Sequence, residues 1–385
     1  MLKVMSITGS RADYGLMRPI YSLLKSKTDM CLQLIVLGMH NHSAYKKTLE
    51  QIYSDGFGDV LRIQNEDNNQ SKHFMLDEMS DWIHHIPRLM EQSKPDLLLL
   101  QGDRGEMLAG AIAAAHKNIP IVHMSGGDVT GSIDNHIRNA VSKFSHFHLA
   151  TCKSSARNLE LMGELRERIK VVGEPGVDAI YSTELIDISE FKKSYFIPNE
   201  QHFALISFHP VTNDLSEGKL GIELILKEVL DSGINALVTY PNTDTGSEEI
   251  VSTIEKYRSS NQVTILPDMG QVAYFSAMKH AKFLIGNSSS GIIESPYFGL
   301  PTINVGTRQE LREKSSNVID VRVDSYEIRQ AINRALSDSS FIEQSHRCSR
   351  PYGEGDTAIK TIEVLRNLPT SEILMRKYQH GLIIE

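Results

Sequence analysis

Ionisable side chains gather between residues 101 and 138, in the stretch QGDRGEMLAGAIAAAHKNIPIVHMSGGDVTGSIDNHIR. An apolar run at 97–100 predicts a buried strand that stops at Gly102-Asp103-Arg104, and a second predicted strand, 119–124, carries His123 near its end. Ligands of open α/β sheets bind outside the carboxyl ends of the strands. We therefore expect one polar crevice there, to which these residues contribute: Asp103, Arg104, Glu106, His123, Asp128, Asp134 and Arg138.

Two aspartates of this stretch, Asp103 and Asp134, are candidates for acid–base chemistry. Two carboxyl groups in one partly buried crevice can have different pKa values, so that one acts as a base and the other as an acid. Each also has a simpler interpretation, Asp103 as a turn residue after a glycine and Asp134 as the N-cap of a helix at 135–145. We favour catalysis for both, whereas for Asp128 the two interpretations stay open.

A second polar segment, Gly286-Asn287-Ser288-Ser289-Ser290-Gly291, follows an apolar strand and opens a helix predicted at 289–298. Backbone N–H groups at the start of a helix bind anions, and serine hydroxyls add donors. The segment matches neither the Walker pattern nor the dinucleotide fingerprint. Three serines between two glycines exceed what helix capping needs, so we predict a phosphate site here, with Glu294 placed to accept hydrogen bonds from a ribose.

Three further strand ends carry cationic or imidazole side chains. His209 follows the strand 203–208, where it could donate to a phosphate, act as an acid, or be satisfied by the backbone of its loop. Arg308 follows the strand 301–305, and Arg11 follows the strand 2–8. A lone arginine on a loop is often only solvated, but its position after a strand of this kind favours contact with an anionic ligand.

Strands and helices alternate along the chain in two series. Strands are predicted at 2–8, 31–37, 97–101, 119–124 and 146–151, and again at 203–208, 234–239, 263–266, 282–285 and 301–305. This alternation predicts an α/β protein with two doubly wound parallel-sheet (Rossmann-like) domains that face a cleft. Glycine and proline cluster at 173–176, so we place the first domain at 1–175 and the second at 176–367, with a C-terminal helix, 368–385, crossing back to the first.

Composition restricts the classes of function. The 385 residues are 41% hydrophobic and 23% charged, with a net charge of −8 and no basic stripe, which argues against nucleic-acid binding. No apolar run approaches a membrane span, and the first residues enter a strand rather than a signal peptide. Cys31, Cys152 and Cys348 lie far apart, which favours free thiols over a disulfide framework or a zinc site. We expect a cytoplasmic protein without metal or redox cofactor.

Eight segments, in this order, resemble a known family: GSRADYG (9–15), GMH (38–40), GDRGE (102–106), HMSGGDVTGSID (123–134), SKFSHFH (142–148), FHPVT (208–212), GNSSSG (286–291) and GTRQ (306–309). The chain is similar over nearly its whole length to the hydrolysing UDP-N-acetylglucosamine 2-epimerases of the sialic-acid pathway. The resemblance implies a GT-B-like fold of two domains, a UDP-sugar substrate, no cofactor, and a homodimer or homotetramer.

The same resemblance assigns roles to individual residues. It implies that the diphosphate and the rest of the nucleotide are held by Arg11, His209, Asn242, Ser288, Ser289 and Arg308, with Glu294 on the ribose. It places Asp103, Arg104 and Asp134 on the catalytic side. Many family members carry a glutamate two residues after the strand-end histidine, where this chain has Ser125. Base chemistry would then rest with Asp103 and Asp134, or with Asp128 as a substitute.

The expected reaction couples loss of the C2 proton of the sugar to departure of UDP from C1, which gives a 2-acetamidoglucal. Asp103 is the expected base, and Asp134 is expected to guide the hydration that yields N-acetylmannosamine. Four alternatives stay open: the same chemistry on UDP-2,4-diacetamido-2,4,6-trideoxyglucose for a legionaminate-type pathway, a non-hydrolysing 2-epimerase, a GT-B glycosyltransferase, and a UDP-sugar binder without turnover. The non-hydrolysing enzymes carry a Glu-Ala-Gly-Leu-Arg run in place of the segment that begins at Ser125.

Overall fold

The computed structural model describes residues 1–41, 46–63, 74–130, 133–197, 202–211, 216–241 and 246–377. The chain forms two compact units. Unit 1 comprises Met1–Val129, Ile133–Ala179 and Tyr352–Glu385, and unit 2 comprises Thr130–Ser132 and Ile180–Pro351. Within the part of the chain that is described, no helix combines the length and the apolar character needed to cross a membrane.

Unit 1 is built on a seven-stranded parallel sheet with the order β3-β2-β1-β4-β5-β6-β7. Its strands are β1 (Leu2–Thr8), β2 (Met30–Val36), β3 (Leu61–Arg62), β4 (Leu97–Gln101), β5 (Ile121–Met124), β6 (Phe147–Ala150) and β7 (Ile169–Val171). Its helices are α1 (Arg11–Lys25), α2 (Lys46–Ser54), α3 (Phe74–Ser93), α4 (Gly105–His116), α5 (Ile133–Phe144), α6 (Lys153–Leu161), α16 (Thr357–Arg366) and α17 (Ser371–Met375), and α7 (Pro175–Ser182) spans the change of unit.

The strands of unit 1 are buried on both faces, which explains their continuous apolar runs. Successive residues alternate between two cores, so that Leu97 and Leu99 pack with α1 and α16 while Leu98 packs with α3 and α4. The small residues of α4 let this helix lie close to the sheet, because a Cβ at Gly110 would come within 2.3 Å of the Ile7 side chain. Both cores hold the carboxyl ends of β1 and β4 in place.

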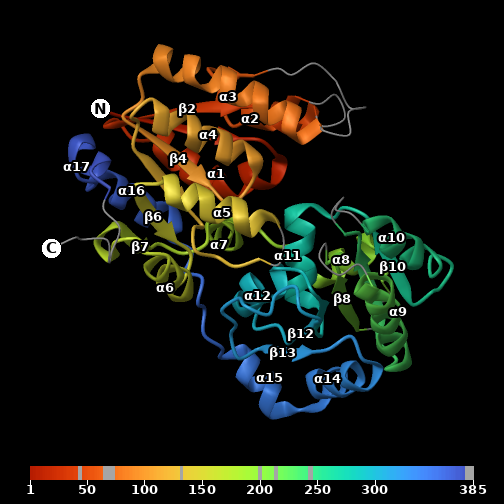
Figure 1. The fold of residues 1–385 in the computed structure, drawn as a ribbon. Coiled ribbons are helices and arrows are strands. Elements are labelled where there is room, and N and C mark those ends of the chain that lie inside the picture. Colours follow the sequence, from red (N-terminus) through yellow and green to blue (C-terminus); the bar gives the residue numbers. More distant parts are fainter. Residues whose placement is uncertain are drawn as a thin grey trace. The chain divides into compact units, whose positions relative to one another are not determined.

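The C-terminal helices return to unit 1 (Figure 1), where α16 packs on α1. The glycine and proline cluster at 173–176 is not a linker, since Pro175 begins α7 and the Glu174 N–H donates to the Tyr352 carbonyl at 2.8 Å. Apart from the segment Thr130–Ser132, the units change at 179–180 and 351–352, whereas the sequence placed the changes at 175–176 and 367–368. The apolar face of α16, with Ile362 and Leu365 in the unit 1 core, accounts for the earlier return.

Unit 2 contains a six-stranded parallel sheet with the order β10-β9-β8-β11-β12-β13. Its strands are β8 (Phe203–Ser207), β9 (Asn235–Thr239), β10 (Val263–Leu266), β11 (Leu284–Gly286), β12 (Thr302–Val305) and β13 (Val318–Val321). Its helices are α8 (Ile188–Ser194), α9 (Ser216–Asp231), α10 (Ser247–Glu255), α11 (Gly270–His280), α12 (Ser290–Ile293), α13 (Ser295–Phe298), α14 (Ser325–Ser337) and α15 (Ser339–His346). The sequence did not predict β3, β7 and β13, because these strands are short and lack a fully buried apolar run.

A buried ionic cluster fastens the C-terminal segment to unit 1. Lys377 Nζ donates to the carbonyls of Lys143 at 2.7 Å and Ser145 at 2.6 Å, and lies 3.0 Å from Glu164 Oε2. Burial opposes ionisation of Glu164, but hydrogen bonds from His148 and Lys143, with the charge of Lys377, lower its pKa to about 2. This cluster therefore holds the carboxyl-terminal end of α5, the helix that also carries Asp134.

We expect Lys377→Met to lower the free energy of unfolding by about 2–4 kcal/mol, because two buried carbonyls and a buried carboxylate lose a charged donor. Urea unfolding at pH 7 measures the change. Lys360→Met is the matched control, since Lys360 forms an exposed pair with Asp356 at 2.8 Å and should cost less than about 1 kcal/mol. Equal losses in the two variants would contradict a structural role for the Lys377 cluster.

Candidate functional site

Each sheet has one position where the strand order reverses, and the predicted site residues follow the strands at these positions. In unit 1 the reversal lies between β1 and β4, which precede Arg11 and Asp103. In unit 2 it lies between β8 and β11, which precede His209 and Ser288. Such reversal points open a crevice at the carboxyl ends of the strands, where ligands of α/β sheets bind. The topology thus gives each unit one candidate subsite.

The loop between β1 and α1 is held by a buried carboxylate, Asp13. It accepts hydrogen bonds from the Gly9 N–H at 3.0 Å and from the Thr8 hydroxyl at 2.7 Å, and with Ser10 it forms a capping box. Burial raises the pKa of Asp13, against the effect of these hydrogen bonds. Arg11, the first residue of α1, is exposed beside this rigid turn, so its guanidinium can reach a ligand.

Glu106 connects three strand-end loops of unit 1 rather than facing a ligand. Its side chain is only 1% exposed and fills the space beside Gly9 and Gly38, because a Cβ at Gly9 would lie 2.3 Å from Glu106 Oε1. Arg104 Nη2 donates to the same carboxylate at 2.9 Å and remains about a third exposed. Glu106 therefore positions Arg104, which is the ligand-accessible member of the pair.

Helix α5 links the other acidic candidates. Arg138 forms an ion pair with Asp103 and donates to the Asp128 carbonyl at 2.8 Å. The Asp128 carboxylate accepts hydrogen bonds from Thr151, which follows β6, and from Ser155 of α6, a geometry that supports anchoring of its loop rather than base chemistry. Asp134 is the second residue of α5, so the N-cap interpretation is wrong because the helix begins before this residue.

His123 was expected in the crevice but lies inside the sheet. It is fully buried, with Nε2 at 2.8 Å from the Gly102 carbonyl and Nδ1 at 3.0 Å from the Ser142 hydroxyl. Burial lowers its pKa to about 3, so the ring is neutral and ties β5 to α5. Ser125, which directly follows β5, has a left-handed backbone conformation with φ of 63°. Its shielded hydroxyl has no hydrogen-bond partner among the described residues.

In unit 2 the serine segment begins at a close contact between two strands. Gly286, paired with Ser207, has φ of 145°, and an added Cβ would lie 2.0 Å from the Ser207 carbonyl oxygen. Ser288 is nearly buried and shares a hydrogen bond of 3.1 Å with Ser290, while Ser289 precedes α12. The predicted helix 289–298 is instead two short helices that meet at Glu294. Hydroxyls and loop N–H groups, rather than a long helix dipole, are therefore the donors that this segment could offer to an anion.

His209 and Arg308 meet at the serine segment through Asn287. The side-chain amide of Asn287 makes two hydrogen bonds with the backbone of His209. The backbone carbonyl of Asn287 accepts a hydrogen bond from Arg308 Nη1 at 3.1 Å. Burial and the neighbouring Arg308 lower the pKa of His209 to about 3. The imidazole is therefore neutral near pH 7, which suits hydrogen-bond donation to a phosphate better than acid catalysis.

Two polar atoms near this segment are shielded from water without a well-formed hydrogen bond to the described residues. They are Oε2 of Glu294 and the hydroxyl of Tyr274, a residue of α11 close to Ser207 and Ser288. Burial raises the pKa of Glu294 to about 7. Unsatisfied buried groups are rare in native proteins, so their position beside the serine segment supports a ligand that completes them.

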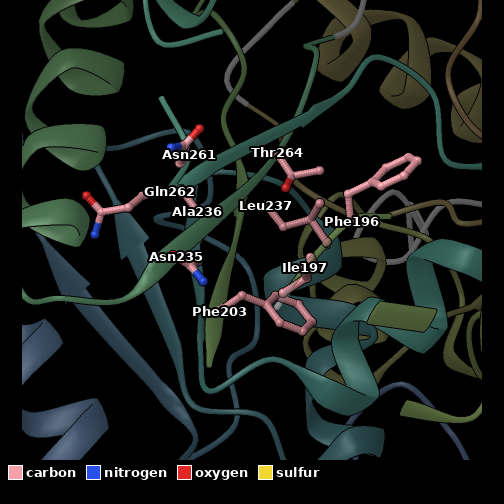
Figure 2. A pocket seen from close by; sticks show the side chains of 9 residues that line it. All are labelled: Phe196, Ile197, Phe203, Asn235, Ala236, Leu237, Asn261, Gln262 and Thr264. Carbon is pink, nitrogen blue, oxygen red and sulfur yellow. The ribbon is translucent and has the colours of Figure 1, made fainter. Parts of the chain in front are cut away.

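Sequence reasoning missed the part played by Asn287, Tyr274 and Asp13. The last two sit in ordinary helical patterns, and no local spacing marks the contact of Asn287 with a residue 78 positions away. Asn242 lies outside the described residues. A shallow depression in unit 2 is lined partly by Phe203 and Asn235, which begin β8 and β9 (Figure 2). It lies at the amino ends of the strands, opposite the candidate subsite.

We expect Glu294→Gln to become more stable relative to the wild type as pH rises from 4.5 to 7. In this window the unfolded carboxyl is ionised, whereas the folded carboxyl, with its pKa raised to about 7, stays protonated. Stability that the wild type has at low pH is lost as pH rises through the folded pKa, and glutamine has no such loss. The relative gain should reach about 1–3 kcal/mol in urea unfolding. Parallel pH profiles would contradict burial of this carboxyl.

Comparisons with known proteins point to one family. The sequence profile of the family described as UDP-N-acetylglucosamine 2-epimerase matches residues 23–366. The UDP-N,N'-diacetylbacillosamine 2-epimerase (hydrolyzing) of Legionella pneumophila is 35% identical over 377 residues, 97% of this chain and 98% of that protein. The UDP-N-acetylglucosamine 2-epimerase of Neisseria meningitidis is 33% identical over 380 residues, 98% of each chain.

Solved structures show the same fold. The UDP-GlcNAc 2-epimerase of Neisseria meningitidis bound to UDP-GlcNAc superposes with a TM-score of 0.82 and 19% identity, over 95% of this chain and 100% of that one. The enzyme of Methanocaldococcus jannaschii in complex with UDP-GlcNAc and UDP gives 0.76 and 18%, over 95% and 99%. The predicted GT-B-like fold class with two doubly wound parallel sheets is thereby confirmed. With the profile match and relatives above 30% identity, the chain belongs to the UDP-N-acetylglucosamine 2-epimerase family.

Proposed function

We propose that this protein is a hydrolysing UDP-N-acetylglucosamine 2-epimerase, which releases UDP and N-acetylmannosamine. The observation that carries the proposal is its 35% identity, over 97% of the chain, to an enzyme described as a hydrolysing 2-epimerase. The loop Ser125-Gly126-Gly127-Asp128 is consistent with it, because it does not match the Glu-Ala-Gly-Leu-Arg run of the non-hydrolysing enzymes.

The nucleotide is proposed to bind at the carboxyl ends of β8 and β11. Hydroxyl and backbone donors of Ser288 and Ser289, the neutral imidazole of His209 and the guanidinium of Arg308 would hold the diphosphate. Glu294 would accept from the ribose hydroxyls through the oxygen that has no described partner. Such donors stabilise negative charge as it develops on the departing UDP, so they serve the reaction as well as binding.

The sugar chemistry is proposed to use the residues of unit 1. Asp103 removes the proton from C2 as the C1–oxygen bond to UDP breaks, which gives 2-acetamidoglucal and UDP. Water then adds its hydroxyl to C1, and a proton reaches C2 from the opposite face. Arg138 keeps Asp103 in position, Asp134 guides the hydration, and Arg11 with Arg104 neutralises the leaving diphosphate.

The sugar itself has two candidates. UDP-N-acetylglucosamine is the substrate class implied by the family, whereas the name of the Legionella relative favours UDP-N,N'-diacetylbacillosamine, with an acetamido group at C4. The elimination and hydration are the same for both sugars, because they involve only C1 and C2. Initial rates of UDP release from the two substrates, compared as kcat/KM, decide between them.

We expect Arg308→Ala to weaken UDP binding by about 1.5–3 kcal/mol, because a charge-assisted hydrogen bond to phosphate is lost. Isothermal titration calorimetry measures the change. Arg322→Ala is the control, since Arg322 is 85% exposed in its pair with Glu327, and it should bind UDP as the wild type does. Unchanged affinity in Arg308→Ala would remove this residue from the nucleotide site.

The reaction run in heavy water distinguishes the enzyme classes. We expect free UDP together with a manno-configured sugar that carries deuterium at C2, because the original C2 hydrogen leaves during elimination. A glycosyltransferase or a simple UDP-sugar hydrolase would keep protium at C2, and a non-hydrolysing epimerase would exchange C2 while UDP stays attached. Nuclear magnetic resonance of the products shows both the hydrogen isotope at C2 and whether UDP is still attached to the sugar. A released sugar with protium at C2, or no turnover of either substrate, would overturn the proposal.

A further inference from the structure

We propose that Asn287 is the positioning residue of the diphosphate site. Its hydrogen bonds hold His209 and Arg308 so that both can donate to the same diphosphate. This inference rests on the proposed function, since it assumes that the diphosphate binds at this end of unit 2. Asn287 directly follows β11 and is only 1% exposed. A side chain so buried cannot bind a ligand itself, so its effect must pass through its neighbours.

The first neighbour is His209. Asn287 Oδ1 accepts from the His209 N–H at 2.7 Å, and Asn287 Nδ2 donates to the His209 carbonyl at 2.8 Å. The paired strands β8 and β11 end at Ser207 and Gly286, so the amide of Asn287 continues the pairing where the backbones separate. Only a carboxamide offers a donor and an acceptor side by side in this geometry. The imidazole of His209 is thereby anchored at its own backbone.

The second neighbour is the loop after β12. The backbone carbonyl of Asn287 accepts hydrogen bonds from Arg308 Nη1 at 3.1 Å and from Gln309 Nε2 at 3.0 Å. The backbone is also held on the other side of the Asn287 Cα, because the Asn287 N–H donates to the Ser207 carbonyl at 3.2 Å. Gly286, with its positive φ, permits this close approach. Loops after three different strands therefore meet at one residue.

A positioning role has a consequence that a general structural role does not have. Loss of the Asn287 amide should misplace His209 and so weaken binding of the diphosphate, while contacts to the uracil and ribose continue. A loss of folding stability alone would lower the fraction of folded protein but would leave the ratio of UDP to uridine affinity unchanged. The ratio is therefore the informative measurement.

The test is a double-mutant cycle with UDP and uridine titrations of wild type, Asn287→Ala, His209→Ala and the double variant. We expect Asn287→Ala to bind UDP about tenfold more weakly, with uridine affinity within about twofold of the wild type. In the His209→Ala background, Asn287→Ala should weaken UDP binding less than about threefold, because the imidazole that Asn287 positions is already absent. Asn287→Ser, which removes less volume, gives the same comparison should the alanine variant not fold.

Asn317→Ala is the matched control. Asn317 is also fully buried and donates two hydrogen bonds of 2.8 Å, to Ser295 and to the Leu300 carbonyl. It lies before β13, at the amino ends of the strands, so it should lower stability and leave the affinity ratio unchanged. Equal weakening of UDP and uridine, or the same UDP loss with and without His209, would overturn the inference. A wild type that binds no UDP would overturn the proposed function as well.

Discussion

The exposed ends of two parallel sheets depend on one kind of interaction, a buried side chain that satisfies the backbone of a strand-end loop. In unit 1 the Asp13 carboxylate accepts a hydrogen bond from the Gly9 N–H. In unit 2 the side-chain amide of Asn287 hydrogen-bonds to both the N–H and the carbonyl of His209. Loop N–H groups next to a sheet cannot be left unpaired in the interior without a large cost. Both loops are thus rigid, and both carry a side chain proposed to meet the diphosphate.

This constraint divides the charged and polar residues of the site into two sets. Glu106 and His123 are buried and hold loops and strands together, which explains charge near a core without assigning it chemistry. Arg104 and Asp103 are partly exposed, and each is held by a buried partner of opposite charge, Glu106 or Arg138. A buried ion pair costs desolvation and stabilises little by itself. Its value here is to fix the orientation of the accessible member.

The sequence predicted the strands near the reversal points because strands buried on both faces form continuous apolar runs. It therefore located Arg11, Asp103, His209 and Arg308 at strand ends. Burial of His123 was not predictable, since polar residues inside a sheet are recognised only from their partners. The break at Glu294 was missed for the same reason, because helical spacing continues across it while the backbone turns. Contacts between distant residues decide both cases.

Some buried polar atoms have no well-formed hydrogen bond to the described residues, and these atoms connect stability to binding. Glu294 Oε2 and the Tyr274 hydroxyl lie beside the serine segment of unit 2, and the Ser125 hydroxyl follows β5 of unit 1. Each such group lowers the stability of the folded protein, because it loses hydrogen bonds to water on folding and gains no well-formed ones in their place. A ligand that supplies the missing hydrogen bonds therefore binds to a protein that has already met the cost of desolvation. Ligand binding and folding are linked by mass action, so under the proposed function a nucleotide sugar that pairs with these atoms would also stabilise the folded protein.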